Sequence, residues 1–431
     1  MKNLNRDELL NAAKEHLSPV LARSTQIIME KGAGPYIYTS DGERYLDYCS
    51  GIAVNNLGHC HPRLVAAAKK QIDNLIHGSF SLGYYPGAIK LAMKLSEISP
   101  GDLSMVFFSN SGAEAVEGAL KAARWKTQRP GIIAFRGAFH GRTMGALSVT
   151  SSRAGFRENY APFLPSVFHA PYPYCFRCPY EKSEDNCSLQ CLAEIERLFE
   201  TIIPPGDIAS IIFEPVQGEG GYIVPPVKYV QSLRELAGRH KIPLIFDEIQ
   251  TGFGRTGKMF AAEHFNVTPD IMCLGKAMAG GFPLSAVIGT RDIMGDWTPG
   301  AHGTTFGANP VSCAVALSAL EVMEEDNVLD NCRKMGSYFK SELMALKKEF
   351  PVIGDVRGLG LMLAVELVDD KGKPDKSATE KITGYCLEQK LLFFNCGVYK
   401  NCIRFITPLN IDSSVIDEGL KIFRDALKNV T

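Results

Sequence analysis

Short apolar runs alternate with helical stretches from about residue 100 to residue 290, and this alternation restricts the possible folds more than any other feature of the chain. Runs of roughly four to eight apolar residues, bounded by Gly or Pro and separated by helices, are typical of buried strands in a parallel sheet. The sequence therefore predicts an open α/β sheet. Its predicted strands are Met105 to Phe108, Ile132 to Phe135, Ile211 to Phe213, Leu244 to Phe246, Ile271 to Leu274 and Ala286 to Ile288.

The chain is too long for one simple core, because 431 residues exceed the size at which a single core stops growing. Near its start, Tyr36 to Thr39 and Arg44 to Asp47 alternate apolar and polar residues around an Asp-Gly turn, which predicts a β-hairpin. We predict a large domain over residues 71–320, with a mostly parallel central sheet flanked by helices. Residues 1–70 and 321–431 are predicted to form a small α+β domain.

The composition narrows the class of partner. Lys and Arg number 46 against 47 Asp and Glu, so the net charge of −1 provides no global field to attract nucleic acid or an anionic membrane. No stretch approaches the roughly 18 to 20 apolar residues that cross a bilayer. Twelve cysteines in a chain whose start resembles an amphipathic helix rather than a signal peptide favour free thiols in a reducing compartment. We expect a cytoplasmic protein whose partners are small molecules or another copy of itself.

Two predicted strands end in polar groups that suit one cofactor. Asp247 ends the run from Leu244, and Lys276 follows the run from Ile271. Ligands bind at the carboxyl ends of parallel strands, so the carboxylate and the amine are expected to face one crevice. Pyridoxal phosphate matches this pair, because a lysine forms its Schiff base and an acid holds its pyridinium proton. A helix cap for Asp247 and a solvated surface position for Lys276 are the alternatives.

A phosphate site is predicted at Ser111, Gly112 and Ala113, which lie between a strand and a helix rich in Ala and Glu. The first N–H groups of a helix are unpaired and the helix dipole favours anions, so small residues there admit a phosphate. An ordinary N-cap is the alternative explanation.

The chain resembles the class III, ω-amino acid type aminotransferases of pyridoxal phosphate fold type I, and its motifs are most similar to those of 4-aminobutyrate aminotransferases. The resemblance implies the fold type I architecture and a homodimer, or a tetramer, whose active sites lie at the subunit interface. The ordered motifs that carry it are Gly51-Ile52-Ala53-Val54, Gly58-His59-Cys60-His61-Pro62, Ser111-Gly112-Ala113, Phe139-His140-Gly141-Arg142-Thr143, Glu214-Pro215-Val216-Gln217-Gly218-Glu219-Gly220-Gly221, Asp247-Glu248-Ile249-Gln250, Lys276, Thr305 with Asn309-Pro310, and Arg404.

Further cofactor contacts are expected around the ring. Phe139 offers a flat face for stacking on the pyridine, and Ile249 is expected to pack on the opposite face. A core position is the alternative for Phe139. Gln250 suits the phenolic oxygen of the ring, while His140 and Glu214 are expected close to it.

Thr305 is similar to the family's threonine that reaches the phosphate of the neighbouring subunit. Thr304 is the alternative in register. Either residue would make each active site depend on both subunits.

The resemblance also assigns residues to the substrate. Arg142 is similar to the arginine that takes a substrate carboxylate, and Arg404 to the one that binds the α-carboxylate of glutamate or 2-oxoglutarate. Glu219 resembles the gate that pairs with Arg404 when an ω-amino acid enters and swings away when glutamate enters. Ile52 is similar to the residue at this place in 4-aminobutyrate enzymes. A surface salt bridge is the alternative for the Glu219–Arg404 pair.

The expected reaction moves the amino group of an ω-amino acid, similar to 4-aminobutyrate, to 2-oxoglutarate by a ping-pong route. Lys276 would move a proton between the substrate Cα and the cofactor's C4′, so Lys276 and Asp247 are the expected catalytic residues. An amino acid racemase or epimerase of the same family is an open alternative, and a decarboxylase is another. A catalytically inactive scaffold would lack the cofactor altogether.

Four cysteines stand in two pairs, Cys175 with Cys178 and Cys187 with Cys191. An all-thiolate zinc site needs pairs of this kind. The loop between the pairs is short and the second pair has three intervening residues, so free thiols are the default interpretation and a metal site the alternative.

Overall fold

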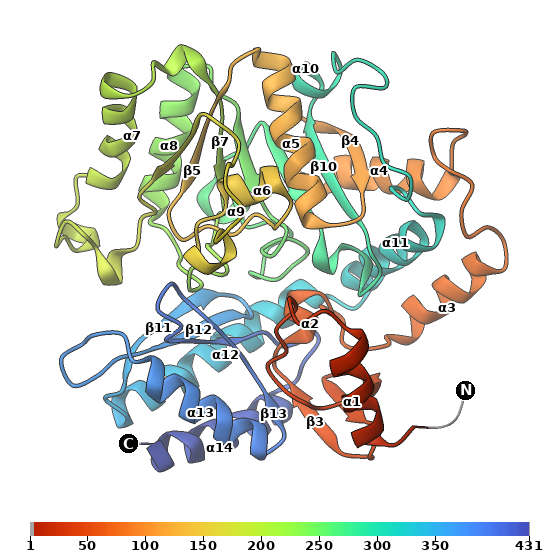
Figure 1. The fold of residues 1–431 in the computed structure, drawn as a ribbon, viewed down its shortest axis with the longest axis vertical. Coiled ribbons are helices and arrows are strands. Elements are labelled where there is room, and N and C mark those ends of the chain that lie inside the picture. The colour runs from red at the N-terminus through yellow and green to blue at the C-terminus, as the bar shows by residue number, and fades with distance from the viewer. Residues whose placement is uncertain (1–3, 431) are drawn as a thin grey trace.

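A computed structural model describes residues 4–430 and has a large central sheet above two smaller sheets (Figure 1). The large sheet has the strand order β4-β10-β9-β8-β7-β5-β6. Its members are β4 (Leu103–Ser109), β5 (Gly131–Phe135), β6 (Val167–Ala170), β7 (Ile208–Phe213), β8 (Leu244–Asp247), β9 (Ile271–Leu274) and β10 (Ser285–Thr290). The six predicted strands are confirmed, and the whole agrees with the mostly parallel sheet of fold type I.

Two features of this sheet were not specified by the sequence. β10 pairs antiparallel with both β4 and β9, because the connection from β9 is too short for the crossover helix that a parallel neighbour needs. β6 was not predicted from the sequence. It pairs only with β5 at the sheet edge and is half-buried, so it lacks the continuous apolar run of the central strands.

Helices cover both faces of the large sheet. Figure 1 shows α5 and α6 on the near face, with α7 and α8 at the side of β5 and β7. The helices of this part are α4 (Pro86–Ile98), α5 (Gly112–Thr127), α6 (Met144–Val149), α7 (Gln190–Thr201), α8 (Val227–Arg239), α9 (Ala262–Phe265), α10 (Arg291–Met294) and α11 (Pro310–Glu325).

The two smaller sheets join the beginning and the end of the chain. One has the order β1-β2-β3-β13, in which β1 (Met29–Ala33), β2 (Tyr36–Thr39) and β3 (Arg44–Asp47) include the predicted hairpin, and β13 (Leu391–Leu392) runs parallel to β3. The other, β11-β12-β15-β14, is antiparallel throughout. The domain boundaries at residues 70 and 320 stay a prediction. The remaining elements are β11 (Ile353–Leu359), β12 (Met362–Leu367), β14 (Phe394–Cys396), β15 (Cys402–Phe405), α1 (Arg6–His16), α2 (Ser50–Ala53), α3 (Pro62–Ile72), α12 (Val328–Glu349), α13 (Lys376–Glu388) and α14 (Ser413–Val430).

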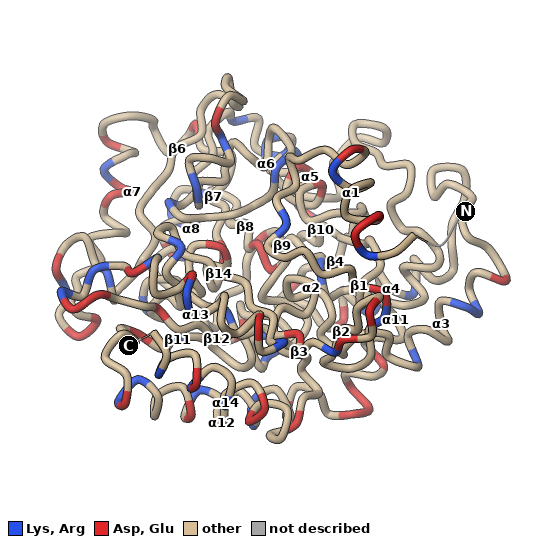
Figure 2. Tube along the Cα trace, turned by 60° about the horizontal axis from the view of Figure 1, so that its bottom comes forward, with Lys and Arg blue, Asp and Glu red and all other residues tan. Residues whose placement is uncertain are grey.

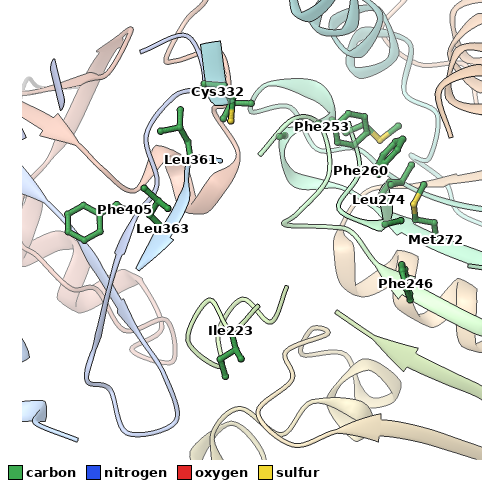
Figure 3. Packing of buried hydrophobic residues seen from close by; sticks show 14 of the residues in the cluster. Ile223, Phe246, Phe253, Phe260, Met272, Leu274, Cys332, Leu361, Leu363 and Phe405 are labelled. Atoms are coloured by element: carbon green, nitrogen blue, oxygen red, sulfur yellow. The ribbon is translucent and has the colours of Figure 1, made fainter. Parts of the chain in front are cut away.

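One apolar cluster runs through both parts of the molecule. Figure 3 shows Phe246, Met272 and Leu274 of the large sheet on one side and Leu363 and Phe405 of a smaller sheet on the other. Burial of this continuous surface is the main favourable contribution to folding, and it ties the sheets to each other.

The surface carries mixed charge. In Figure 2, Lys and Arg are interspersed with Asp and Glu along the trace, as the balanced composition predicts. Within residues 4–430, no helix is both long enough and apolar enough to cross a bilayer.

Candidate active site

Asp247 and Lys276 lie at the carboxyl ends of the neighbouring parallel strands β8 and β9, where Asp247 is paired in register with Cys273. Burial lowers the pKa of the Lys276 amine to about 8, against the opposing effect of the Asp247 carboxylate. Arg404 lowers this pKa further, while Glu214 and Glu219 raise it. The predicted pair therefore shares one electrostatic environment, and Lys276 is poised to exchange a proton near neutral pH.

Asp247 is oriented from behind by His140. The two side chains are buried, and His140 Nδ1 donates to Asp247 Oδ2 over 2.7 Å. Burial by itself would lower the pKa of His140, but the hydrogen bond and charge of Asp247, together with nearby Glu214, raise it instead. The second oxygen, Asp247 Oδ1, accepts from the backbone N–H of Ile249. His140 thus serves the site through Asp247, a role that its sequence motif alone did not specify.

Glu214 follows β7 and is buried beside this pair. Its carboxylate accepts the backbone N–H of Phe139 at 2.9 Å and that of Gly218 at 2.8 Å. Burial raises the pKa of Glu214 to about 7, although the positive charge of His140 opposes the rise. Glu214 therefore fixes the backbone that carries Phe139. Both of its carboxylate oxygens accept hydrogen bonds from backbone N–H groups.

The expected phosphate cup lies at the N-terminus of α5. Ser111 is the N-cap and its hydroxyl accepts from the backbone N–H of Glu114, so the ordinary cap is present together with the small residues Gly112 and Ala113. A Cβ at Gly112 would lie only 2.9 Å from Ile249 Cδ1. Ser285 donates to the Ser111 carbonyl at 2.8 Å and was missed, because no pattern marks a serine that begins a strand.

These residues fit pyridoxal phosphate. The buried Gln250 Oε1 has no hydrogen-bond partner in the described structure, so the carboxamide is available to a ligand. Gly112 leaves the backbone at the α5 N-terminus bare, and Ile249 packs against it as one wall. The donor set combines a helix N-terminus for phosphate, a buried acid for a ring nitrogen and an amine with a lowered pKa.

The substrate side contains a chain of three charged groups. Arg404 on β15 is buried and its Nη1 lies 3.1 Å from Glu219 Oε2. Glu219 Oε1 in turn lies 2.8 Å from Nη2 of Arg153, a residue that the sequence interpretation missed. Burial would lower the pKa of Arg404, but Glu219 keeps it above its usual range. Arg142 is not part of these ion pairs. It is exposed, and its guanidinium lies 5.7 Å from the Phe139 ring centre.

Ile52 occupies a strained turn. The backbone from Ser50 to Ala53 has positive φ throughout, and φ is 66° at Ile52, which is an outlier for a β-branched side chain. Asp47 Oδ1 accepts the backbone N–H groups of Cys49 and Ser50 and holds the turn. Strain that surrounding contacts maintain is typical of functional sites, so this turn supports the choice of Ile52 as a candidate.

Thr304 and Thr305 differ in their surroundings. Thr304 Oγ1 accepts from Asn110 Nδ2 and from the Gly307 backbone N–H, both at 3.1 Å. Thr305 is exposed. Thr304 is therefore engaged within its own chain, which favours Thr305 as the residue that faces outward.

The four cysteines line one cavity of about 20 Å³ next to Tyr174 and Tyr229. All four are free thiols, and burial raises the pKa of Cys175 to about 11 and that of Cys191 to about 12. Within residues 4–430, no group of three or more His, Cys, Asp or Glu side chains is arranged to hold a metal ion. The structure thus gives the metal alternative no support.

Comparison with known proteins identifies similar chains along nearly the whole length. The family model for aminotransferase class-III matches residues 18–427. A probable 4-aminobutyrate aminotransferase of Bacillus subtilis is 39% identical over 417 residues, which cover 96% of each chain. An alanine/serine racemase of Pyrococcus horikoshii is also 39% identical, over 98% of this chain and 90% of the racemase. The solved structure of a thermostable (S)-enantioselective omega-transaminase from Thermomicrobium roseum is 32% identical, with a TM-score of 0.92 and complete coverage of both chains.

Proposed function

The chain belongs to the class III aminotransferase family of pyridoxal phosphate enzymes, and we propose that it transfers the amino group of an ω-amino acid such as 4-aminobutyrate to 2-oxoglutarate. The observation that carries the proposal is the contact between Glu219 and Arg404. A single arginine facing a movable carboxylate can serve two substrates of different charge. Glu219 neutralises Arg404 when an ω-amino acid is bound, and Arg404 binds the α-carboxylate when glutamate is bound.

The remaining residues have complementary roles in this proposal. Arg142 takes the carboxylate that both substrates share. Ile52 supplies an apolar wall, which suits the carbon chain of a monocarboxylate donor. The name of the Bacillus subtilis relative supports 4-aminobutyrate as the donor.

The protein's own residues would hold the cofactor and move the proton. Ser111, Gly112 and Ala113 would hold the phosphate, Phe139 and Ile249 would enclose the ring, and Asp247 would keep a proton on the ring nitrogen. When bound, pyridoxal phosphate supplies an electron sink that acidifies the C–H of the carbon bearing the amino group, which is the ω-carbon of the donor and Cα of glutamate. Lys276, with a pKa lowered to about 8, would take the proton from that carbon and pass it on to the cofactor.

The test is an assay of the purified holoenzyme with 2-oxoglutarate and one of three donors: 4-aminobutyrate, ornithine or L-isoleucine. We expect glutamate to form fastest with 4-aminobutyrate. Lys276→Ala should abolish glutamate formation while the circular dichroism spectrum stays that of the folded protein. Failure of the wild type to form glutamate from any ω-amino acid would refute the proposal.

A racemase or epimerase is the second candidate, because the Pyrococcus horikoshii relative carries that name at the same identity. Racemisation requires a second proton donor on the face opposite Lys276. Incubating one enantiomer of alanine, serine or isoleucine without any 2-oxo acid separates the two activities. Appearance of the opposite Cα configuration without glutamate formation, measured by chiral chromatography, would favour the racemase.

A further inference from the structure

Glu219 is shared between two arginines through different oxygens. Its Oε2 lies 3.1 Å from Arg404 Nη1 and its Oε1 lies 2.8 Å from Arg153 Nη2. Arg153 lies in the segment after α6, a helix that packs beside the large sheet, whereas Arg404 lies on β15 of a smaller sheet. The Glu219 carboxylate therefore connects these two parts of the molecule. The backbone carbonyl of Glu219 accepts from the Gly397 N–H at 2.9 Å, which fixes the main chain and leaves only the side chain to turn.

This arrangement matters because Glu219 must leave Arg404 whenever a second substrate carboxylate binds there. A carboxylate that loses its partner in a partly buried site is strongly destabilised. Glu219 is in such a site, with 17% of its side chain exposed. With Arg153 in place, Glu219 can turn about its Oε1 contact and remain paired.

We propose that Arg153 is the second docking partner of Glu219, and that it determines specificity by holding Glu219 away from Arg404 when a dicarboxylate substrate is bound. The proposal rests on the proposed function, because it assigns to Arg153 the dicarboxylate half of the reaction. Arg153 is a positioning residue here, since it acts on the substrate through Glu219. The state with an ω-amino acid does not need it, because Glu219 is then paired with Arg404.

The surroundings of Arg153 fit this role. Its guanidinium lies 5.5 Å from the ring centre of Phe156, which also lies 4.5 Å from the guanidinium of Arg142. The Phe156 ring thus packs against both Arg153 and Arg142, the arginine expected to bind the shared substrate carboxylate. The buried Nε of Arg153 has no hydrogen-bond partner in the described structure, so a donor remains free for Glu219 in its turned position.

The test measures binding of unreactive acids to the holoenzyme by calorimetry. Glutarate carries two carboxylates and should need both Arg142 and Arg404, whereas valerate carries one. In Arg153→Gln we expect the dissociation constant of glutarate to rise about tenfold or more, as for the loss of a partly buried charge partner, with little change for valerate. Arg153→Lys should restore most of the glutarate affinity.

A double-mutant cycle decides whether Arg153 acts through Glu219. In the Glu219→Gln background, Arg153→Gln should have no further effect on glutarate. Arg239→Gln is the control, because Arg239 pairs with Glu196 on the surface. Equal losses for both acids, or a full loss that persists in the Glu219→Gln background, would overturn the proposal.

Kinetics provide an independent check. Arg153→Gln should raise KM for glutamate and leave KM for 4-aminobutyrate nearly unchanged. If the wild type makes no glutamate from any ω-amino acid, the proposed function fails, yet the comparison of glutarate with valerate still decides the role of Arg153.

Discussion

At the scale of single residues, the surroundings of Lys276 change the protonation of its amine. Burial lowers its pKa to about 8, and the nearby positive charge of Arg404 acts in the same direction. Asp247 opposes both effects, so the final value reflects a balance between desolvation and charge. This balance leads to a prediction about pH.

We predict that the rate of amino-group transfer rises with pH and levels off above about pH 8. The Lys276 amine can accept the proton from the donor's amine-bearing carbon only when it is neutral, and below its pKa of about 8 the protonated fraction grows. The measurement is the pH dependence of a single half-reaction under saturating donor. Lys276→Arg should lose the activity rather than shift the curve, and a flat profile between pH 6 and 9 would contradict the assignment.

A second prediction concerns His140. His140→Leu removes the donor to Asp247 Oδ2 without adding bulk, and we expect kcat to fall by about tenfold to hundredfold, the range found for hydrogen-bond partners that orient metal ligands. His140→Asn retains a donor near the position of Nδ1 and should lose less. Equal activity of the Leu variant and the wild type would show that Asp247 does not need this support.

At the scale of structural elements, the N-terminus of α5 depends on the absence of a side chain. Ile249 comes from the segment after β8 and packs where the Cβ of residue 112 would lie. The phosphate cup and the wall of the ring site therefore constrain each other.

We predict that Gly112→Ala weakens cofactor retention and lowers the free energy of unfolding by about 1–3 kcal/mol, the usual cost of overpacking. The added Cβ would be 2.9 Å from Ile249 Cδ1 and 3.0 Å from its Cγ2. The measurements are cofactor absorbance after dialysis and denaturant unfolding.

Gly384→Ala is the matched control. Gly384 lies in the interior of α13, and apart from its chain neighbours and the adjacent backbone of its own helix nothing lies within 4 Å of the added Cβ, so the change should stabilise the helix by about 0.5–1 kcal/mol.

At the scale of the whole molecule, apolar periodicity predicted the elements of the large sheet but not every detail of their assembly. The six predicted strands are confirmed because each carries a continuous apolar run, including β4 at the sheet edge and the antiparallel β10. β6 leaves only a short run, because His169 interrupts the apolar residues of this half-buried strand. The direction of β10 depends on connection length rather than on its own residues.

The residues of the candidate site likewise fall into those that the sequence could predict and those that it could not. Asp247, Lys276 and Ser111 could be predicted because each lies at the end of a recognisable strand or the start of a helix. Arg153 and Ser285 were missed, because their partners Glu219 and Ser111 are distant in sequence and only the fold brings them together. Long-range polar contacts of this kind have no periodic signature.

Four large apolar side chains near α4 and Phe306 are exposed among residues 4–430. Leu82 and Tyr84 are 87% and 84% exposed, Met93 on α4 is 67% exposed, and Phe306 is 60% exposed. Tyr84 and Met93 line a cavity of about 650 Å³ that Thr304 also reaches. Large exposed apolar surfaces of this kind usually mark protein–protein interfaces.

We predict that this surface joins two copies of the chain and that Tyr84→Lys with Met93→Lys produces a monomer. The charges would have to be buried in the interface, where they would lack partners. Thr305 is exposed next to Phe306 and is expected to reach the phosphate of the neighbouring subunit, so separating the subunits should also weaken cofactor binding. Sedimentation equilibrium measures the mass, and cofactor absorbance measures retention.

Ile202→Lys is the control, because Ile202 is 62% exposed directly after α7, far from α4 in Figure 1. A double variant that stays dimeric, or a monomer with full cofactor retention, would contradict the prediction, whereas Thr305→Ala should weaken retention while the mass stays that of a dimer.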